Sequence, residues 1–464
     1  MKLIFLLLIL FSPIFNYISF PLKKEKISSL LDNKNPKEIF SSFLVSRLFI
    51  NLNIGSNKID IKAFLIQSKT ELIIAGKNII NHKYNETEST TYNITNKNKI
   101  SFQYGMYNEG ILSKDNFNIL KNNIELNSFN IDFILGTKAS STYTDIKEAQ
   151  VGLHLPLLES YPDYNLIRSL KNNNATLSYN WYLNFNNFEK GEGKMIVDGF
   201  PHDLNKKKYL KENFVKTNAI DRQYTVLWGF KFSSINYGNQ NLELGLDLRA
   251  HFEFDYGIIT APKEVGELLE SLFFEKYISL NICFKEKIGV IGNYFFYCKK
   301  NDKFDIEKFE SIYFNCADLY IIFELDYKDL FYIDNNNNIY FLIEFSKNSK
   351  IWIFGEIFLR KYYIVFNQDE KTLGYYKNME KPKNNKNKND NIITNNSSWY
   401  KTFIIIIILI LLVICVLFMG IYIYKNKKNR KKKANELDNE YNYEPKFDLS
   451  NDNDNLIEGD KSIN

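Results

Sequence analysis

Short runs of apolar residues, separated by polar turns, dominate the chain from Leu48 to Tyr376. Segments such as FINLNI, IDIKAFLI, ELIIAG, YNWYLNF and IYFLIEF are rich in β-branched and aromatic residues and are bounded by Asn, Gly or Lys. Runs of this length and composition are typical of β-strands. The stretch from Pro262 to Tyr277 instead repeats its apolar residues at helical spacing, with proline in the first turn. The pattern predicts a mostly-β region of about 330 residues with few helices, too large for a single sandwich.

Two uninterrupted apolar runs lie near the ends of the chain. The first, MKLIFLLLILFSPIF, has the pattern of a secretory signal peptide, which predicts residues 1–20 as the signal with cleavage near Ser19 or Phe20. An uncleaved signal anchor is the alternative. The second, residues 402–424, is an uncharged stretch of 23 residues, and as a helix it would be about 34 Å long, enough to cross a bilayer.

The basic run KNKKNRKKK follows the predicted membrane span directly. Basic residues beside a membrane helix stay on the cytosolic side. The sequence therefore predicts a single-pass type I membrane protein, with its ectodomain luminal or extracellular, in the secretory or endolysosomal system or at the cell surface. Pro21 to Lys37 is expected to be a short, poorly ordered lead, residues 378–400 a flexible stalk, and residues 425–464 a disordered cytosolic tail.

Composition and charge exclude several classes of site. The net charge of +5 comes mostly from the basic run beside the span, so no folded basic face for nucleic acid is expected. The histidines are far apart and no CxxC motif exists, so no metal site and no cofactor are predicted. Four glycosylation acceptors are predicted before the span: Asn85, Asn93, Asn174 and Asn395. In the tail, Leu456-Ile457 fits an acidic dileucine signal for a sorting adaptor.

Several motifs occur in one collinear order. They are Ile54-Gly55-Ser56, Tyr104-Gly105, Gln150-Val151-Gly152-Leu153, GEGKMIVDG, and the closing segment IWIFGEIFLRKYYIVF. Together they resemble pepsin-type (family A1) eukaryotic aspartic peptidases from about Leu48 to Tyr376. The resemblance implies a mostly β, bilobal pepsin-like aspartic peptidase fold with a cleft between two β-rich lobes, residues 45–205 and 206–377, followed by one C-terminal transmembrane helix.

The resemblance also locates the catalytic positions. Peptidases of this family use two aspartates that share a proton, because like charges a few ångströms apart cannot both ionise. An ungapped count from Ile54 places Ile66 at the first aspartate, and a one-residue slip would place Gln67 there. A count back from Pro262 places Glu253 at the second. Allowing two deletions would use Asp255 instead. Because isoleucine cannot accept a proton, the resemblance implies a degenerate dyad with at most one remaining carboxylate, Glu253 or Asp255.

Three further expectations follow from the resemblance. Tyr104 and Gly105 match the flap that closes over substrate, and Cys283 and Cys316 match the family's second-lobe disulfide, which leaves Cys298 unpaired or in an intermolecular bond. The favoured function is binding of a polypeptide in the interlobe cleft without hydrolysis. The alternatives are an active membrane-bound aspartic endopeptidase, which needs a carboxylate from elsewhere, and a surface glycoprotein whose cleft binds nothing.

Overall fold

The computed structural model describes the chain between Tyr17 and Met379. It covers residues 17–379 except 26–33, 68, 81, 103–105, 122–123, 142–146, 156–163, 187–192, 223–224, 243–246 and 290–291. The chain divides into two units, Met1–Pro382 and Lys383–Asn464, and every described residue belongs to the first. Most of the predicted signal peptide and stalk, and all of the predicted span and tail, lie outside the described residues.

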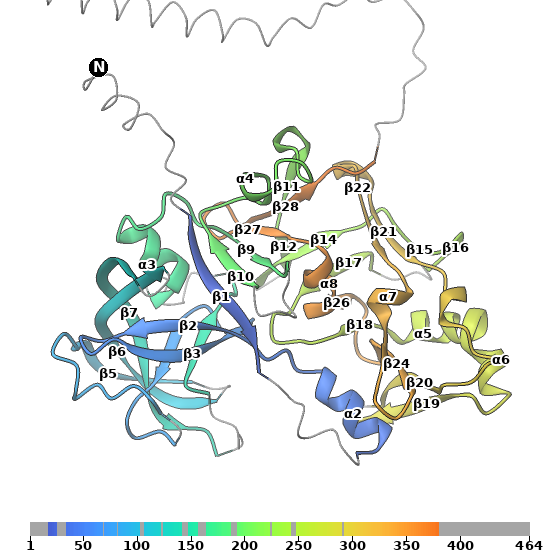
Figure 1. Cartoon of the computed structure of the whole chain (residues 1–464), viewed down its shortest axis with the longest axis horizontal. Coiled ribbons are helices and arrows are strands. Elements are labelled where there is room, and N and C mark those ends of the chain that lie inside the picture. The colour runs from blue at the N-terminus through green and yellow to red at the C-terminus, as the bar shows by residue number, and fades with distance from the viewer. Residues whose placement is uncertain are drawn as a thin grey trace, which may run out of the picture. The chain divides into compact units, whose positions relative to one another are not determined.

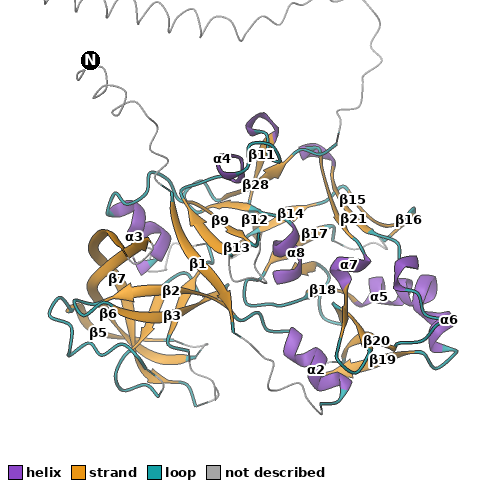
Figure 2. Ribbon diagram, in the orientation of Figure 1, coloured by secondary structure: helices purple, strands orange, loops and turns teal. Residues whose placement is uncertain are grey.

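The described part is mostly β, as the apolar pattern predicts (Figure 2). The largest sheet has 13 strands in the order β11-β28-β27-β9-β10-β1-β2-β3-β8-β4-β7-β6-β5. Its strands are β1 (Ile18–Lys24), β2 (Leu48–Ile54), β3 (Ile59–Ile66), β4 (Leu72–Ala75), β5 (Asn93–Ser101), β6 (Tyr107–Lys121), β7 (Ile124–Ala139), β8 (Ala149–Gly152), β9 (Asn180–Asn184), β10 (Lys194–Val197), β11 (Phe214–Asn218), β27 (Val365–Asn367) and β28 (Thr372–Tyr376). The last strands of the chain thus complete a sheet begun by the first ones (Figure 1).

The remaining strands form three smaller sheets. The nine-stranded sheet consists of β14 (Gly229–Lys231), β17 (Arg249–Phe252), β18 (Ile259–Pro262), β19 (Cys283–Ile288), β20 (Asn293–Lys299), β23 (Phe331–Ile333), β24 (Asn338–Phe341), β25 (Ile343–Ser346) and β26 (Trp352–Phe354). The four-stranded sheet consists of β15 (Ser234–Tyr237), β16 (Gln240–Asn241), β21 (Ile312–Cys316) and β22 (Ile321–Leu325), and β12 (Ile220–Arg222) pairs with β13 (Thr225–Leu227).

Helices are short and connect the strands. They are α2 (Pro36–Phe43), α3 (Leu166–Asn172), α4 (Pro201–Leu204), α5 (Lys263–Leu269), α6 (Glu275–Ile278), α7 (Tyr327–Leu330) and α8 (Glu356–Lys361), the π-helical η5 (Glu270–Phe274), and the 3₁₀ turns η4 (Lys211–Asn213), η6 (Ile306–Lys308) and η7 (Ala317–Leu319). The predicted helix at Pro262–Tyr277 is confirmed, because α5, η5 and α6 follow one another without a break and Pro262 caps the first turn. Among the described residues, no helix is long and apolar enough to span a membrane.

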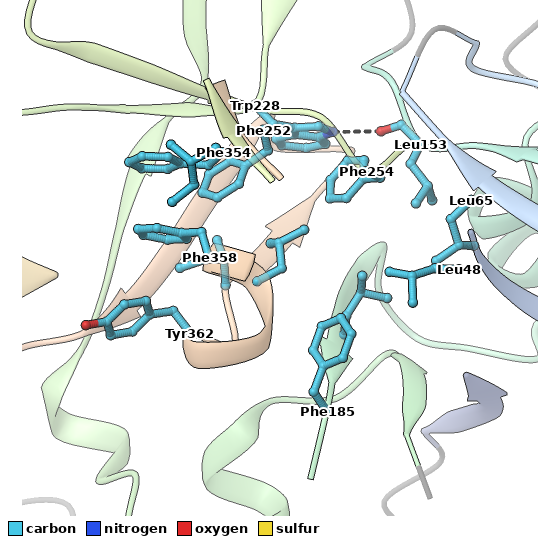
Figure 3. Packing of buried hydrophobic residues seen from close by; sticks show 14 of the residues in the cluster. Leu48, Leu65, Leu153, Phe185, Trp228, Phe252, Phe254, Phe354, Phe358 and Tyr362 are labelled. Atoms are coloured by element: carbon cyan, nitrogen blue, oxygen red, sulfur yellow. Dashed lines mark hydrogen bonds between the residues drawn. The ribbon is translucent and has the colours of Figure 1, made fainter. Parts of the chain in front are cut away.

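One aromatic-rich core joins the N-terminal half (residues 48–197) to the C-terminal half (residues 225–354). The indole N–H of Trp228 donates a hydrogen bond to the carbonyl oxygen of Leu153 at 2.7 Å, and Figure 3 shows Phe254 beside this contact. Phe254 also packs edge-on against Trp181 and Phe366, with ring centroids 5.1 and 5.3 Å apart. Burying large rings from both halves in one cluster fixes the two halves against each other.

The prediction of a poorly ordered lead at Pro21 to Lys37 is wrong for its described parts. Strand β1 pairs with both β10 and β2, and helix α2 begins at Pro36 with an Asn35 capping box. Buried and less buried residues alternate along β1, with Ile18, Phe20 and Leu22 buried, as is typical of a strand. This alternation is hard to see in the sequence, because it directly follows the apolar leader. Cleavage near Ser19 or Phe20 would remove the start of this strand, and the signal peptide itself stays a prediction.

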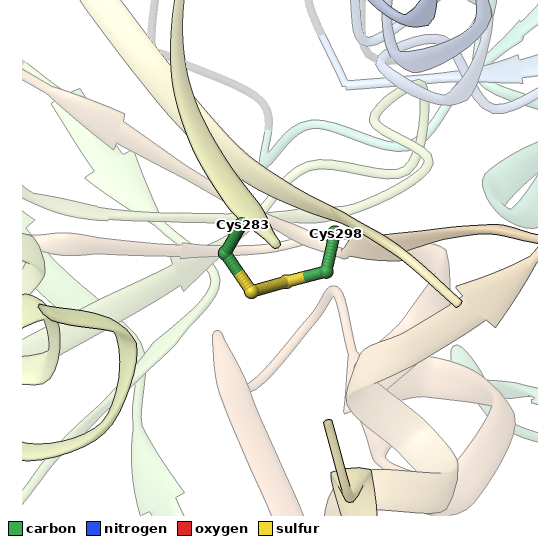
Figure 4. The surroundings of a disulfide bond; sticks show 2 residues. All are labelled: Cys283 and Cys298. Atoms are coloured by element: carbon green, nitrogen blue, oxygen red, sulfur yellow. A yellow bond between two sulfur atoms is a disulfide. The ribbon is translucent and has the colours of Figure 1, made fainter. Parts of the chain in front are cut away.

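The predicted Cys283–Cys316 disulfide is also wrong. Cys283 bonds to Cys298 (Figure 4), while Cys316 is free and buried. The reason is the register of the β19–β20 hairpin, which places Cys283 directly opposite Cys298. Burial raises the pKa of the Cys316 thiol, so this cysteine is an apolar core residue rather than a reactive one.

Candidate active site

Two loops of the molecule have the same topological surroundings. The Ile66 loop (residues 66–71) joins β3 to β4, and the Glu253 loop (residues 253–258) joins β17 to β18. Strand β3 runs parallel to β8 while β4 runs antiparallel to it, and β17 and β18 make the same two pairings with β26. Each half of the molecule therefore holds its loop between two strands that share one partner strand.

Each loop also packs against a glycine at or just after the end of that partner strand. A Cβ atom on Gly152 would lie 2.6 Å from backbone atoms of Lys69 and Thr70, and one on Gly355 would lie 2.5 Å from the carbonyl oxygen of Tyr256. Only glycine permits such a close approach of two backbones. The glycines of the Gln-Val-Gly-Leu and Trp-Ile-Phe-Gly motifs thus have a physical role, because they let each loop press onto its partner strand.

The strand registers identify which residues of the two loops correspond. Ile66 is paired with Gly152. Phe252 is paired with Phe354, so Glu253 follows at the level of Gly355, and its N–H donates to the Phe354 carbonyl at 3.0 Å. Glu253 is therefore the counterpart of Ile66.

The correspondence continues along the two loops. Phe254 is the counterpart of Gln67, and Asp255 is the counterpart of residue 68, which lies outside the described residues. The two loops thus have the same backbone setting but different side chains at each position compared.

The Glu253 loop carries two carboxyl groups. One oxygen of Glu253 lies 3.1 Å from Nε2 of buried His251. Asp255 faces the Glu253 carboxyl and the backbone N–H of Gln67, and its Oδ1 is buried without a hydrogen-bond partner among the described residues. Burial, and next the Glu253 charge, raise the pKa of Asp255 to about 6. The pair can therefore hold a proton at mildly acidic pH.

The Ile66 loop supplies no carboxyl group at the corresponding place. Ile66 is buried, and so is Gln67, whose side-chain amide has no hydrogen-bond partner among the described residues. Lys69 holds its ammonium 4.9 Å from the centre of the Phe102 ring, and burial lowers the pKa of this lysine. Glu71 is buried further along the loop. Neither isoleucine nor the glutamine amide can take a proton from water.

Sequence reasoning missed one residue that shapes the Ile66 loop. Asn165, fully buried, donates from its side-chain amide to the carbonyl oxygens of Thr70 at 2.5 Å and Gly152 at 3.3 Å. Its side-chain oxygen caps helix α3. The available signal was an Asn directly before the apolar helix LIRSL, which marks an N-cap but not the loop that the amide would reach.

Other predicted site residues are only partly within the described structure. Tyr104 and Gly105 lie outside it, although the strands on either side form the expected hairpin, with Ile100 paired to Gly110. Asn395, Leu456 and Ile457 also lie outside the described residues. Of the described acceptors, Asn93 and Asn174 are exposed and Asn85 is partly buried; their glycosylation stays a prediction. The described residues contain no group of three or more metal-binding side chains.

A comparison with known protein families identifies the family to which these loops belong. The eukaryotic aspartyl protease family matches residues 64–377 of the 464. The chain belongs to the eukaryotic aspartyl protease family. Its mostly β structure is consistent with a pepsin-like fold, and the matched range includes both the Ile66 loop and the Glu253 loop. No curated protein matches the chain.

Proposed function

We propose that this aspartyl protease homologue binds an extended polypeptide between its two lobes without hydrolysing it. One observation carries the proposal: the position equivalent to Glu253 is occupied by Ile66. Peptide hydrolysis on this scaffold needs a carboxylate from each lobe, one taking a proton from water and the other polarising the carbonyl. An alkyl side chain can do neither, whereas binding through the main chain needs no ionisable group.

A retained peptidase activity is the second candidate, and one observation favours it. Glu253 and Asp255 lie on one loop, and the pKa of Asp255 is raised by burial and by Glu253. Two neighbouring carboxyl groups can share a proton even when both come from one lobe. For hydrolysis, Asp255 would have to perform the role that the family gives to the first-lobe aspartate.

The deciding experiment is a cleavage assay on the purified full-length chain, with a mixed peptide library between pH 3.5 and pH 7.5, with and without pepstatin. We expect no pepstatin-sensitive cleavage. Glu253→Gln and Asp255→Asn serve as matched controls, because each removes one acid at nearly unchanged volume. Cleavage that pepstatin blocks and either variant abolishes would establish the peptidase and remove the binding proposal.

Binding itself needs its own measurement. A labelled peptide selected from a random library on the full-length chain should compete with unlabelled pepstatin, because both would occupy the same extended site. Selection that yields no peptide above background from folded protein would leave a surface protein with an empty cleft.

We also propose that residues 402–424 anchor the protein as a single-pass type I membrane protein with the described part luminal or extracellular. The uncharged length of this segment and the basic run after it support the orientation. Resistance to alkaline extraction, together with digestion of the tail and protection of the ectodomain when protease is added to sealed microsomes, would agree. Release of the chain by alkaline extraction would contradict it.

A further inference from the structure

A cavity of about 530 Å³ lies on the 13-stranded sheet, formed by residues none of which belongs to either loop described above. Its floor is made by β9, β11, β27 and β28, and one wall is made by helix α4 and the residues that precede it. Figure 1 shows α4 beside β11 and β28. A volume of this size accommodates a small organic molecule.

Aromatic rings form part of this wall. The rings of Phe200 and Phe214 meet edge-on with centroids 5.3 Å apart, and the His202 ring stacks on Phe200 at 5.0 Å. Both phenylalanines are only partly buried although they line the cavity. Exposed aromatic faces attract cations through the negative charge of the ring face.

Two carboxylates, Asp198 and Asp203, line the same cavity. Asp198 accepts hydrogen bonds from the Leu177 N–H and the Ser178 hydroxyl, and Asp203 accepts one from the Phe200 N–H at 2.9 Å. Neither has a lysine or arginine within salt-bridge distance among the described residues. The second oxygen of Asp203 is 3.7 Å from Nε2 of His202, beyond hydrogen-bond length. Both carboxylates can therefore accept further hydrogen bonds.

The other charges of the lining do not cancel these two acids. Lys216 and Glu370 form an ion pair with each other. Lys211 is exposed and has no acidic partner in the described part of the chain. Burial lowers the pKa of His202, so this ring is neutral at neutral pH. The lining thus carries one uncompensated negative charge.

We propose that this cavity binds a small organic monocation with a flat or apolar body, such as an amine, amidine or guanidine. Asp198 and Asp203 accept its N–H groups, and Phe200 and Phe214 contact its body. This site is separate from the polypeptide site proposed above and does not depend on it.

Three aromatic probes of nearly equal shape test the charge preference by isothermal titration of the full-length chain. Benzamidine is cationic, benzamide neutral and benzoate anionic. We expect only benzamidine to bind. Binding of benzoate in preference would assign the cavity to anions through Lys211 and overturn the proposal, and so would the absence of binding by all three.

Variants locate the bound probe. Asp203→Asn should weaken benzamidine about tenfold or more by removing a charge-assisted hydrogen bond. Lys211→Met should increase the affinity for benzamidine a few-fold, because it removes a repulsive positive charge from the cavity lining. This increase can be measured even if an aspartate variant fails to fold. Loss of binding in Glu253→Gln with no change in Asp203→Asn would place the probe on the Glu253 loop instead and overturn the proposal.

The cation could also be an arginine side chain of another polypeptide, and a second pair of probes separates the sources. Agmatine presents a free guanidinium group, whereas the blocked peptide Ala-Ala-Arg-Ala-Ala presents the same group on a main chain. We expect agmatine to bind and the peptide to bind at least about tenfold more weakly, because the floor and wall restrict the space around the charge. Equal or tighter binding of the peptide would overturn the assignment to a small molecule.

Discussion

The Ile66 loop and the Glu253 loop differ in chemistry while their backbone environments are alike. Each connects two strands that share a partner strand, and each packs on a glycine of that partner. Yet one loop presents an isoleucine where the other presents Glu253. The comparison teaches that strand register and close glycine contacts maintain the same backbone setting whether the loop presents an isoleucine or a glutamate, so family membership and activity are separate questions here.

A second difference lies one residue further along each loop. Phe254 is fully buried among aromatic rings, whereas its counterpart Gln67 is buried with no partner for its amide among the described residues. Burial of Phe254 stabilises the folded protein, whereas burial of the unpartnered Gln67 amide costs stability. Substitutions at these loops can test both differences.

The largest effect is expected for Phe254→Ala. Removing this ring leaves a cavity between Trp181 and Phe366, and aromatic-to-alanine changes in cores cost about 3–5 kcal/mol. Urea denaturation of the full-length chain should show this loss. Phe254→Leu is the control and should recover much of it. A loss below about 1 kcal/mol for the alanine variant would mean that this contact does not hold the two halves together.

The next largest effect is expected from restoring the missing carboxylate. The double variant Ile66→Asp with Glu253→Asp places one aspartate on each loop, and it should hydrolyse peptides at acidic pH at least about 100-fold faster than the natural chain. Pepstatin should block this hydrolysis. The matched control, Ile66→Asn with Glu253→Asp, has the same shape but lacks the proton-accepting group. Equal rates from the two variants would show that a different feature prevents hydrolysis.

Much of the fold was predictable because its signals are local. Strand runs and the helix after Pro262 depend on residue pattern and turn residues, and the structure confirms both. The Cys283–Cys298 bond was not predicted, since it depends on the hairpin register through a turn whose Gly289 and Gly292 have positive φ. Spacing alone could not choose among three cysteines.

The correspondence of the two loops was predictable from the sequence, whereas their electrostatics were not, and the catalytic role of these positions stays a prediction. Counting from motifs placed Ile66 and Glu253, and the strand registers give the same correspondence. The raised pKa of Asp255 could not be read from sequence, because it depends on burial by residues distant in the chain. The unpartnered amide of Gln67 is a tertiary property for the same reason.

A smaller effect, dependent on pH, is expected for Asp255→Asn. Burial and Glu253 raise the pKa of Asp255 to about 6, above the unfolded value of about 4. The native state therefore binds more protons than the unfolded state between these values, and the stability contribution of Asp255 falls as pH rises from about 4 to 6. The asparagine variant should be more stable by about 3 kcal/mol at pH 7.5.

The same variant gives its own control at low pH. Near pH 4 the native aspartate is protonated and the two chains should have nearly equal free energies of unfolding. Glu253→Gln should shift the pH dependence of the natural chain to lower pH, because it removes the second cause of the raised pKa. A variant that is less stable at pH 7.5 would show that the ionised Asp255 makes a favourable interaction with the neighbouring loop.

The smallest effect is expected for Gln67→Met, which replaces the amide by an apolar group of similar length. A buried amide without partners loses its hydration and gains nothing, so the methionine variant should be more stable by about 1 kcal/mol. Gln67→Glu is the opposite control and should destabilise, since it would bury a carboxylate where the amide has no partner among the described residues. If Gln67→Met instead loses stability, the amide has a partner in the folded protein, and a bound polypeptide or an ordered water at the Ile66 loop would be the first to seek. The outcome therefore shows whether the Gln67 amide lacks a hydrogen-bond partner in the folded protein or forms hydrogen bonds with a molecule that binds at the Ile66 loop.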